Sequence, residues 1–154
     1  MNQKKFHIDA IDKKILSILM ENARVPYLEI ARKCRMSGAA IHQRIQKLND
    51  AGIILGWQLK INPVNLGYNT SAYMGIFLEK ANMYESVIKK LKEIPEIQEC
   101  HYTTGNYALF LKILCRDNKH LMELLSNSIQ KIPGVTSTET FISLDISFEK
   151  QIAL

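Results

Sequence analysis

Histidine and cysteine are the residue types in this chain that could most readily support catalysis or bind a metal. The 154 residues include four histidines and three cysteines. Cys34, Cys100 and Cys115 form no CxxC or other metal-ligand spacing, which favours small buried hydrophobes in a reducing compartment. No Ser/His/Asp, paired-carboxylate or metal-ligand cluster occurs either. The sequence therefore predicts no catalytic residue, no metal and no cofactor.

A second group of polar residues could bind a nucleic acid. A helix is predicted from Gly38 to about Ala51, because Ser37 is a good N-cap and Ile41, Ile45 and Leu48 form an inward apolar stripe. On the outward side, amide and imidazole groups suit base edges, and cationic groups suit phosphates or guanine. Small residues at the start of the helix allow a close approach to the groove. The residues predicted to contact DNA are Arg35, Ser37, Gly38, Ala39, His42, Gln43, Arg44, Gln46 and Lys47.

The positive charge of the chain is concentrated around this helix. Residues 1–62 hold 11 Lys/Arg and 5 Asp/Glu, a net charge of +6, whereas residues 63–154 hold 9 and 10, a net charge of −1. A basic module on a near-neutral body is typical of a polyanion-binding protein. A solvated basic face on a small domain is the alternative, and charge alone does not distinguish the two.

Two further helices must hold the reading helix in place. Asp9 can cap a first helix, and a second is predicted from Tyr27 to about Cys34 after Pro26. A tight turn at Arg35-Met36 leads to the third helix, which Gly52 ends. Three short helices with such a turn form a helix-turn-helix, whose last helix enters the major groove. The side chains offered to its core are Ile11, Ile15, Ile18, Leu19, Leu28, Ile30 and Ala31.

The organisation of the chain changes after this head. Trp57–Ile61 alternates and is predicted to be a strand, and Asn62-Pro63 ends it. The segment up to Asn69, which contains Gly67, is the best candidate linker. We therefore predict a helix-turn-helix domain over 1–62, a hinge over 63–69 and a second domain over 70–154.

The second domain is predicted to be α+β, with the order βαββαβ. Ile94-Pro95-Glu96-Ile97 recurs as Ile132-Pro133-Gly134-Val135, each closing a helix and opening a strand. Two βαβ halves with the same punctuation indicate a ferredoxin-like sheet with helices on one face. The other face is predicted to be apolar as well, and such a face requires a partner, most simply a second copy of the chain. The residues assigned to it are Tyr73, Phe77, Tyr107 and Leu109. The strands and helices expected here are a strand from Thr70, a helix over Met83–Ile94, strands over Ile97–Thr103 and Tyr107–Leu114, a helix over Asn118–Ile132 and a last strand within Val135–Phe148.

In order and spacing, the motifs of the chain resemble the Lrp/AsnC family, the leucine-responsive and asparagine-related regulators. The resemblance covers about residues 9–148. It is carried by Asp9-x-x-Asp12-x-x-Ile15-Leu16-x-x-Leu19-x-x-Asn22-Ala23-Arg24, Glu29-Ile30-Ala31, Met36-Ser37, Arg44-Ile45-x-x-Leu48-x-x-x-Gly52-Ile53-Ile54-x-Gly56, Asn62-Pro63, Leu66-Gly67, Ile97-x-x-Cys100-His101, Gly105-x-Tyr107, Pro133-Gly134-Val135 and Thr138-x-Thr140. The resemblance implies a winged-helix-type head and a domain that dimerises, assembles further into octamers and binds small effectors, commonly amino acids, between dimers. It also implies a cytoplasmic regulator of transcription whose partners are double-stranded DNA and copies of itself.

The resemblance also implies an effector site. The implied residues are Thr103, Thr104, Gly105, Asn106, Tyr107, Ala108, Thr136, Ser137, Thr138 and Thr140. The chain departs from the family at Ala108, where a carboxylate that could bind an ammonium group is the rule. The effector then lacks an ammonium group, Glu139 or Asn106 substitutes, or there is no effector. A plain β-turn built on Gly105 and Asn106 is the alternative for the loop itself.

Two other functions are compatible with the resemblance. Some proteins similar to this family decarboxylate sirohaem-type tetrapyrroles with histidine and arginine. His101 and His120 are present here, but Arg116 is the only arginine after residue 62, and a polycarboxylate substrate would need more cations. The other alternative is an architectural DNA-binding protein with little sequence preference, which differs only in its specificity ratio.

Overall fold

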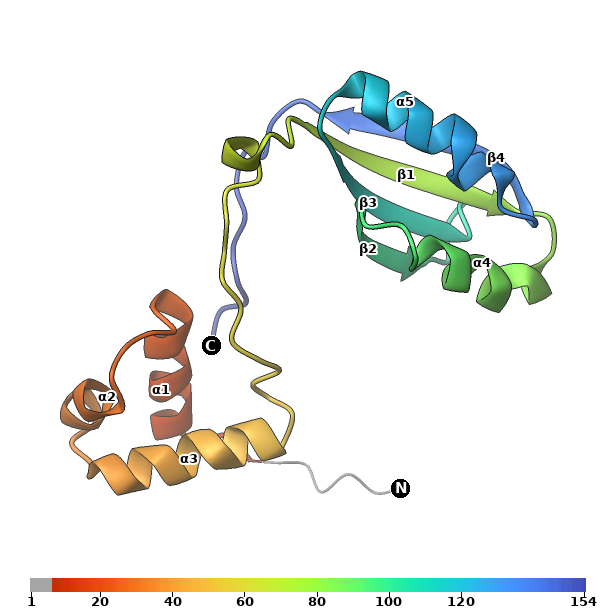
Figure 1. Cartoon of the computed structure of the whole chain (residues 1–154). Coiled ribbons are helices and arrows are strands. Elements are labelled where there is room, and N and C mark those ends of the chain that lie inside the picture. Colours follow the sequence, from red (N-terminus) through yellow and green to blue (C-terminus); the bar gives the residue numbers. More distant parts are fainter. Residues whose placement is uncertain (1–6) are drawn as a thin grey trace. The chain divides into compact units, whose positions relative to one another are not determined.

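The computed structural model describes residues 7–154, so the first six residues of the predicted head lie outside the description. Its N-terminal part consists of three helices, α1 (Ala10–Glu21), α2 (Tyr27–Cys34) and α3 (Gly38–Asp50) (Figure 1). These agree with the predicted helices to within one or two residues. Pro26 precedes the first residue of α2 and serves as its N-cap position.

Helix α1 begins with a reciprocal capping box. Asp9 accepts a hydrogen bond from the backbone N–H of Asp12, and the Asp12 carboxylate accepts one from the backbone N–H of Asp9. Two orphan amide groups of the first turn are therefore satisfied. The predicted cap at Asp9 is confirmed, and the sequence analysis missed the part played by Asp12.

The three helices enclose a small core. Ile15, Ile30, Ile41 and Ile45 are each at most 2% exposed, which confirms the inward stripe of α3. Leu28 was also assigned to this core, but it is 61% exposed. Ile30 and Ala31, which follow it on α2, already fill the inward side of this two-turn helix, so Leu28 points away from the core.

Helix α3 ends as its glycine predicts. Gly52 adopts a φ of +69°, and its N–H donates to the carbonyl of Asn49, while the N–H of Ile53 donates to the carbonyl of Leu48. This is the Schellman arrangement, in which a residue without Cβ takes the left-handed conformation at low cost.

The segment after α3 does not form the predicted strand. Trp57–Ile61 is extended but pairs with no strand among the described residues, and Leu59 is 72% exposed. Alternation alone does not make a strand, which also needs ladder hydrogen bonds to a neighbouring strand. A short 3-10 turn (Val64–Leu66), ended by Gly67 with a φ of +87°, lies in the predicted hinge.

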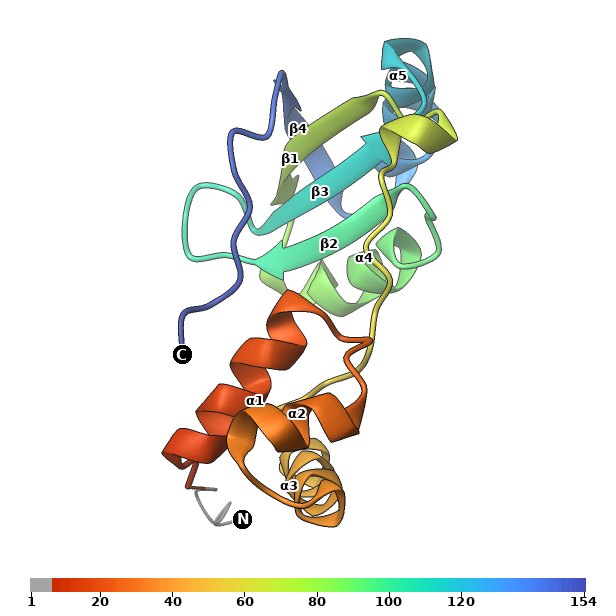
Figure 2. The ribbon, with the colours of Figure 1, turned by 90° about the vertical axis from the view of Figure 1, so that its left-hand side faces the viewer.

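The second part of the chain is a four-stranded antiparallel sheet with two helices. Its elements are β1 (Thr70–Leu78), α4 (Tyr84–Leu91), β2 (Ile97–Tyr102), β3 (Leu109–Cys115), α5 (Asn118–Asn127) and β4 (Val135–Ser143). The strand order is β2-β3-β1-β4, and the two central strands are β1 and β3 (Figure 2). This confirms the ferredoxin-like βαββαβ fold. Helices α4 and α5 are shorter than predicted: α4 ends at Leu91 instead of Ile94, and a 3-10 turn over Ile129–Lys131 takes up the last part of the helix predicted after Asn118.

The two Ile-Pro segments that connect a helix to a strand form the same turn. The N–H of Ile97 donates to the carbonyl of Ile94, and the N–H of Val135 donates to the carbonyl of Ile132. Each half of the domain therefore enters its second strand through the same turn, as the internal repeat predicts.

Helices α4 and α5 cover one face of the sheet (Figures 1 and 2). The core between them is formed by alternate residues of the central strands, including Met74, Ile76, Leu111 and Ile113, all 0% exposed. Burial of each such side chain contributes about 1.5–3 kcal/mol. Leu109 belongs to this core at 0% exposure, so its assignment to the open face was wrong. Strand β3 begins at Leu109 rather than at Tyr107. The odd-numbered side chains of β3 therefore face the helices, and Leu109 does not share the face of Tyr107.

The chain consists of two compact units. One unit ends at Lys60 and also contains Glu149–Leu154, and the other comprises Ile61–Phe148. The ammonium group of Lys60 lies 2.6 Å from the Glu149 carboxylate, which joins the C-terminal residues to the first unit. The predicted division assigned the C-terminal residues to the second domain. Within the residues described, no helix has the length and apolar character needed to span a membrane.

Candidate nucleic-acid interface and effector region

Helix α3 presents a polar face opposite its buried stripe. Ser37 caps the helix by accepting a hydrogen bond from the backbone N–H of Ala40 at 3.2 Å. Because Ile41, Ile45 and Leu48 point inward, the residues on the opposite arc are exposed to solvent. These exposed residues are Ala39, His42, Gln43, Gln46, Lys47 and Asp50.

The turn before α3 depends on Arg35. This residue adopts a left-handed conformation with a φ of +54°, the one positive φ among the described non-glycine residues. The N–H of Met36 donates to the carbonyl of Ala31, which closes the end of α2. The exposed Arg35 side chain therefore lies at the junction of α2 and α3, as the sequence predicts for a cation beside the reading helix.

Arg44 does not lie on the free face of α3 where the sequence analysis placed it. Its Nη1 atom lies 2.7 Å from Oδ1 of Asp12 and 2.8 Å from Oδ2 of Asp9. The Asp12 side chain is 6% exposed, and such a carboxylate requires a cation as partner. The sequence could not distinguish this intramolecular ion pair from a phosphate contact, because both use the same guanidinium chemistry.

The ion pairs shift the acid–base behaviour of this cluster. The backbone N–H of Asp12 and then the Arg44 guanidinium lower the pKa of Asp9. The same two carboxylates, Asp12 first, raise the pKa of Arg44. The contacts therefore stabilise the charged forms of Asp9 and Arg44.

The remaining predicted DNA contacts differ in how far they are held by neighbours. The His42 ring packs edge-to-face on Tyr27 of α2, with centroids 5.8 Å apart. The Gln46 amide donates to the Asp50 carboxylate at 2.8 Å.

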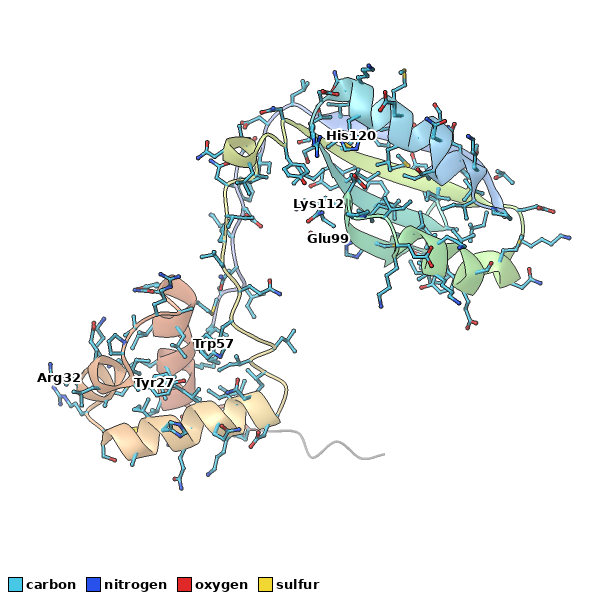
Figure 3. All side chains as sticks on the ribbon, viewed as in Figure 1. Tyr27, Arg32, Trp57, Glu99, Lys112 and His120 are labelled. Atoms are coloured by element: carbon cyan, nitrogen blue, oxygen red, sulfur yellow. The ribbon has the colours of Figure 1, made fainter. Side chains whose placement is uncertain are left out.

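A hollow of about 470 Å³ lies between the start of α1 and α3. It is lined by His7, Asp9, Asp12, Met36, Ala40, Gln43, Arg44 and Lys47. Figure 3 shows the side chains of this head, with Tyr27 and Arg32 marked on α2.

The predicted effector loop connects β2 and β3. The Thr103 hydroxyl donates to the carbonyl of Tyr107, and the Thr103 N–H donates to the carbonyl of Ala108 at 3.1 Å. The N–H of Ala108 donates to the carbonyl of Ile76 at 3.0 Å. The loop is therefore a closed hairpin tied to the central strand β1, with Thr104, Gly105 and Asn106 exposed at its tip.

Tyr107 lies across the sheet rather than in the exposed part of the loop. A Cβ atom on Gly75 would come within 2.3 Å of its ring, so the ring packs directly on the backbone of β1. Its hydroxyl donates to the Glu139 carboxylate at 2.7 Å, and this hydrogen bond raises the pKa of Tyr107. Gly75 and Glu139 were not singled out by the sequence analysis as its partners. A glycine inside an otherwise apolar strand was the available signal for the close approach.

The β4 residues predicted to bind an effector face in different directions. Thr138 and Thr140 pair with Ile76 and Met74, so they lie on the helix-covered side, and Thr138 accepts a hydrogen bond from Gln130. Ser137 pairs with Phe77 and lies on the open side. The Thr136 hydroxyl donates to the carbonyl of Phe77. The structure therefore brings these residues to the same end of the sheet as the hairpin, but not onto one surface.

The open face of the sheet carries an aromatic cluster. Phe110 stacks on both Tyr73 and Tyr107 with centroids 5.9 Å apart, and Phe77 packs on Tyr107 at 5.3 Å. Phe141, opposite Tyr73 on β4, is 45% exposed. The predicted apolar face is thus present, with Phe110 and Phe141 as members that the sequence analysis missed.

Charged groups border this cluster. Glu99 on β2 lies 3.2 Å from His101 and 3.4 Å from Lys112, and Figure 3 shows Glu99 and Lys112 beside one another. The contact with His101, and then the charge of Lys112, lower the pKa of Glu99. The open face is therefore apolar along β1 and charged toward the β2 edge.

These features define a helix-turn-helix unit joined to a ferredoxin-like sheet domain. Comparison with protein-family models matches residues 8–49 to the AsnC-type helix-turn-helix domain and residues 71–152 to the Lrp/AsnC ligand binding domain. Regulatory protein AsnC of Escherichia coli K12 is 41% identical over 141 residues, which cover 92% of this chain and 93% of that protein.

Solved structures give the same result. The structure of E. coli AsnC superposes with a TM-score of 0.92 at 40% identity and covers 96% of this chain and 99% of that one. The transcriptional regulator NMB0573 of Neisseria meningitidis, solved as a complex with L-Met, shares the fold with a TM-score of 0.89 at 22% identity, over 93% of this chain and 94% of that one. The chain belongs to the Lrp/AsnC family of transcriptional regulators.

Proposed function

We propose that this regulator binds double-stranded DNA through the outward face of α3, as an assembly of identical copies. The observation that carries the proposal is the exposed polar arc of α3 opposite a fully buried stripe, on a helix whose N-terminus is capped by Ser37. Such a helix can enter the major groove with its first turns nearest the bases.

The proposed contacts differ from the predicted set by one residue. Arg44 is assigned to the ion pairs with α1, and Lys47 on the exposed side becomes the main phosphate contact of α3. Backbone N–H groups at the start of α3 supply a second favourable site for phosphate. The proposed DNA contacts are Arg35, Ser37, Gly38, Ala39, His42, Gln43, Gln46 and Lys47.

The test is a gel-shift titration of the full chain with the DNA upstream of its own coding sequence, in the presence of excess unrelated duplex. We expect a retarded complex that survives the competitor. A complex that the competitor removes completely would favour an architectural protein without sequence preference, and the absence of any complex would overturn the proposal.

For the assembly, we propose that the open sheet face binds a second copy of the chain. It carries an exposed aromatic ring, Phe141, beside partly exposed ones, together with both charge signs, Glu139 and Glu99 against Lys112, as a self-complementary two-fold interface requires. Further assembly of dimers into octamers is proposed from the family resemblance alone.

A charge placed on this face tests the dimer. Phe141→Asp is expected to lower the molar mass measured by light scattering toward that of a monomer. Met122→Asp, at a 58%-exposed position on α5, is the matched control and should not change the mass. A dimer that persists in Phe141→Asp would contradict the assignment of this face.

For the effector, we propose an amino acid or related metabolite bound near the hairpin tip. The neighbouring structure NMB0573 holds L-Met, which supports this class of ligand. Thr103, Thr104, Gly105, Asn106, Tyr107 and Ala108, with Thr136, Ser137, Thr138 and Thr140, are the proposed residues. Because Glu139 is occupied by Tyr107, Asn106 at the exposed tip is the better substitute for the carboxylate missing at Ala108.

A thermal-melt screen against the twenty amino acids and several 2-oxo acids tests this proposal. A ligand that binds only the folded state raises the melting temperature by mass action. Loss of the shift in Asn106→Ala would place the site at the hairpin tip. The absence of any shift, in protein that binds DNA, would overturn the proposed ligand class.

We propose no enzymatic activity. His101 and His120 are each paired with a glutamate, at 3.2 Å in both cases, and lie on different parts of the sheet domain. Because a DNA partner is proposed and the relative from E. coli is a regulator, we also propose a cytoplasmic location. Tetrapyrrole that stays bound after purification, seen as visible absorbance, would contradict the proposal that the chain has no enzymatic activity.

A further inference from the structure

Helix α3 carries an acidic side chain on the same arc as its proposed base contacts. Ala39, Gln43, Gln46 and Asp50 follow one another at spacings of four, three and four residues, opposite the buried stripe, and all four are exposed. The Asp50 Oδ1 atom lies 2.8 Å from the Gln46 Nε2 atom. An anion on a surface that faces phosphates is unfavourable for binding unless it has a specific use.

The position of Asp50 is also unfavourable for the helix itself. Asp50 is the last residue of α3, where the helix dipole disfavours a negative charge. Its hydrogen-bond partner among the described residues is Gln46, one turn earlier on the exposed surface, and such pairs contribute little to folding. The fold therefore gives no reason for an aspartate at this position.

The Asp50 carboxylate determines the orientation of the Gln46 amide. An ionised carboxylate only accepts hydrogen bonds, so the amide nitrogen of Gln46 must face it and the amide oxygen must face away. A free glutamine can present a donor and an acceptor together, as bidentate recognition of adenine requires. With one N–H bonded to Asp50, Gln46 keeps a single free N–H beside its oxygen, and the carboxylate adds further acceptors, so acceptors outnumber donors on this surface.

We propose that Gln46 and Asp50 form a specificity element that selects a base with an exocyclic amino group in the major groove, adenine or cytosine, and excludes guanine. Adenine N6 and cytosine N4 donate hydrogen bonds, whereas guanine offers two acceptors, O6 and N7, at the same edge. Against guanine, the carboxylate and amide oxygens of this surface meet acceptors and stay unpaired, so guanine is disfavoured. The inference rests on the proposed DNA contact of α3.

The experiment is in vitro selection of random double-stranded DNA by the full chain, followed by affinity measurements on single-base variants of the selected duplex. We expect one position at which guanine lowers affinity by roughly five- to 100-fold, the usual cost of a wrong base pair. Asp50→Ala and Gln46→Ala should both reduce the discrimination at this same position to within about threefold. Asp50→Asn keeps an acceptor for Gln46 and should give an intermediate value.

A matched control removes a negative charge elsewhere in the head. Glu21 is exposed and is the last residue of α1, as Asp50 is of α3, so Glu21→Gln tests the effect of charge alone. It should leave the base preference unchanged. If the wild type selects a motif and Asp50→Ala discriminates against guanine as strongly as the wild type does, this inference is overturned, while the proposal of DNA binding stands. A wild-type chain that selects no motif would overturn both this inference and sequence-specific binding by α3.

Discussion

The Nη1 atom of Arg44 lies 2.7 Å from Oδ1 of Asp12, and this ion pair ties the reading helix α3 to the first turn of α1. The Asp12 carboxylate also accepts a hydrogen bond from the backbone N–H of Asp9 in the capping box. A single buried carboxylate therefore links the start of one helix to the position of another. The exposed face of α3 that is proposed to contact DNA is therefore positioned by an ion pair that is not part of that face.

Replacing Arg44 by alanine should destabilise the helical unit by about 2–3 kcal/mol, because the Asp12 carboxylate is left buried without its cation. Lys47→Ala, at an exposed position on the same helix, should change the free energy of unfolding by less than about 0.5 kcal/mol. Urea unfolding followed by circular dichroism measures both. Equal effects of the two variants would show that the ion pair does not hold α3.

The stability of this unit should also fall in acid. Asp9 has a lowered pKa in the folded state, so its contribution is present above the unfolded pKa and is lost as the pH falls through the folded pKa. Asn is also a good N-cap, so Asp9→Asn removes the charge and keeps the cap. The melting temperature of the wild type should decline more steeply than that of Asp9→Asn below about pH 5. Parallel curves would contradict the assignment.

In the sheet domain, Gly75→Ala should be destabilising. The added Cβ would come within 2.3 Å of the Tyr107 ring, which packs on the sheet and cannot move without breaking its hydrogen bond to Glu139. We expect a loss of about 1–3 kcal/mol, the usual effect of overpacking. Gly105→Ala is the control, because a Cβ there meets no atom within 4 Å. It should leave the free energy of unfolding, measured by chemical denaturation, nearly unchanged.

The hydrogen bond from Tyr107 to Glu139 should be visible in an alkaline titration. Because the folded pKa of Tyr107 is raised, the stabilisation is present below the unfolded pKa and is lost as the pH rises through the folded pKa. Glu139→Gln should therefore lower the pKa at which this tyrosine ionises, as followed by ultraviolet difference absorbance. An unchanged titration would show that the two groups do not interact in solution.

Much of the fold could be predicted because local signals agreed with one another. Asp9, Ser37 and Gly52 marked helix ends, and the repeated Ile-Pro turns marked the two halves of the sheet domain. The strand predicted over Trp57–Ile61 was wrong because alternation describes one segment, whereas a strand also needs a neighbour. Leu109 was assigned to the wrong face because one residue of register reverses every side chain.

The site was harder to predict than the fold. The sequence placed Arg44 among the DNA contacts because its chemistry suits phosphate, and only the position of Asp12 shows that it is already paired. Glu139 was considered as a ligand for an effector, but its hydrogen bond with Tyr107 depends on a pairing between β4 and β1 that no local pattern reveals.

Helix α3 is proposed to bind duplex DNA with Lys47, and not Arg44, as its phosphate contact. The most direct test is the affinity of wild type, Lys47→Ala and Arg44→Gln for one duplex over a range of salt concentrations. We expect Lys47→Ala to weaken binding to all sequences and to reduce the slope of log affinity against log salt by about one. Arg44→Gln should weaken binding with an unchanged slope. An unchanged slope in Lys47→Ala, or no binding by the wild type, would contradict DNA binding through Lys47 of α3.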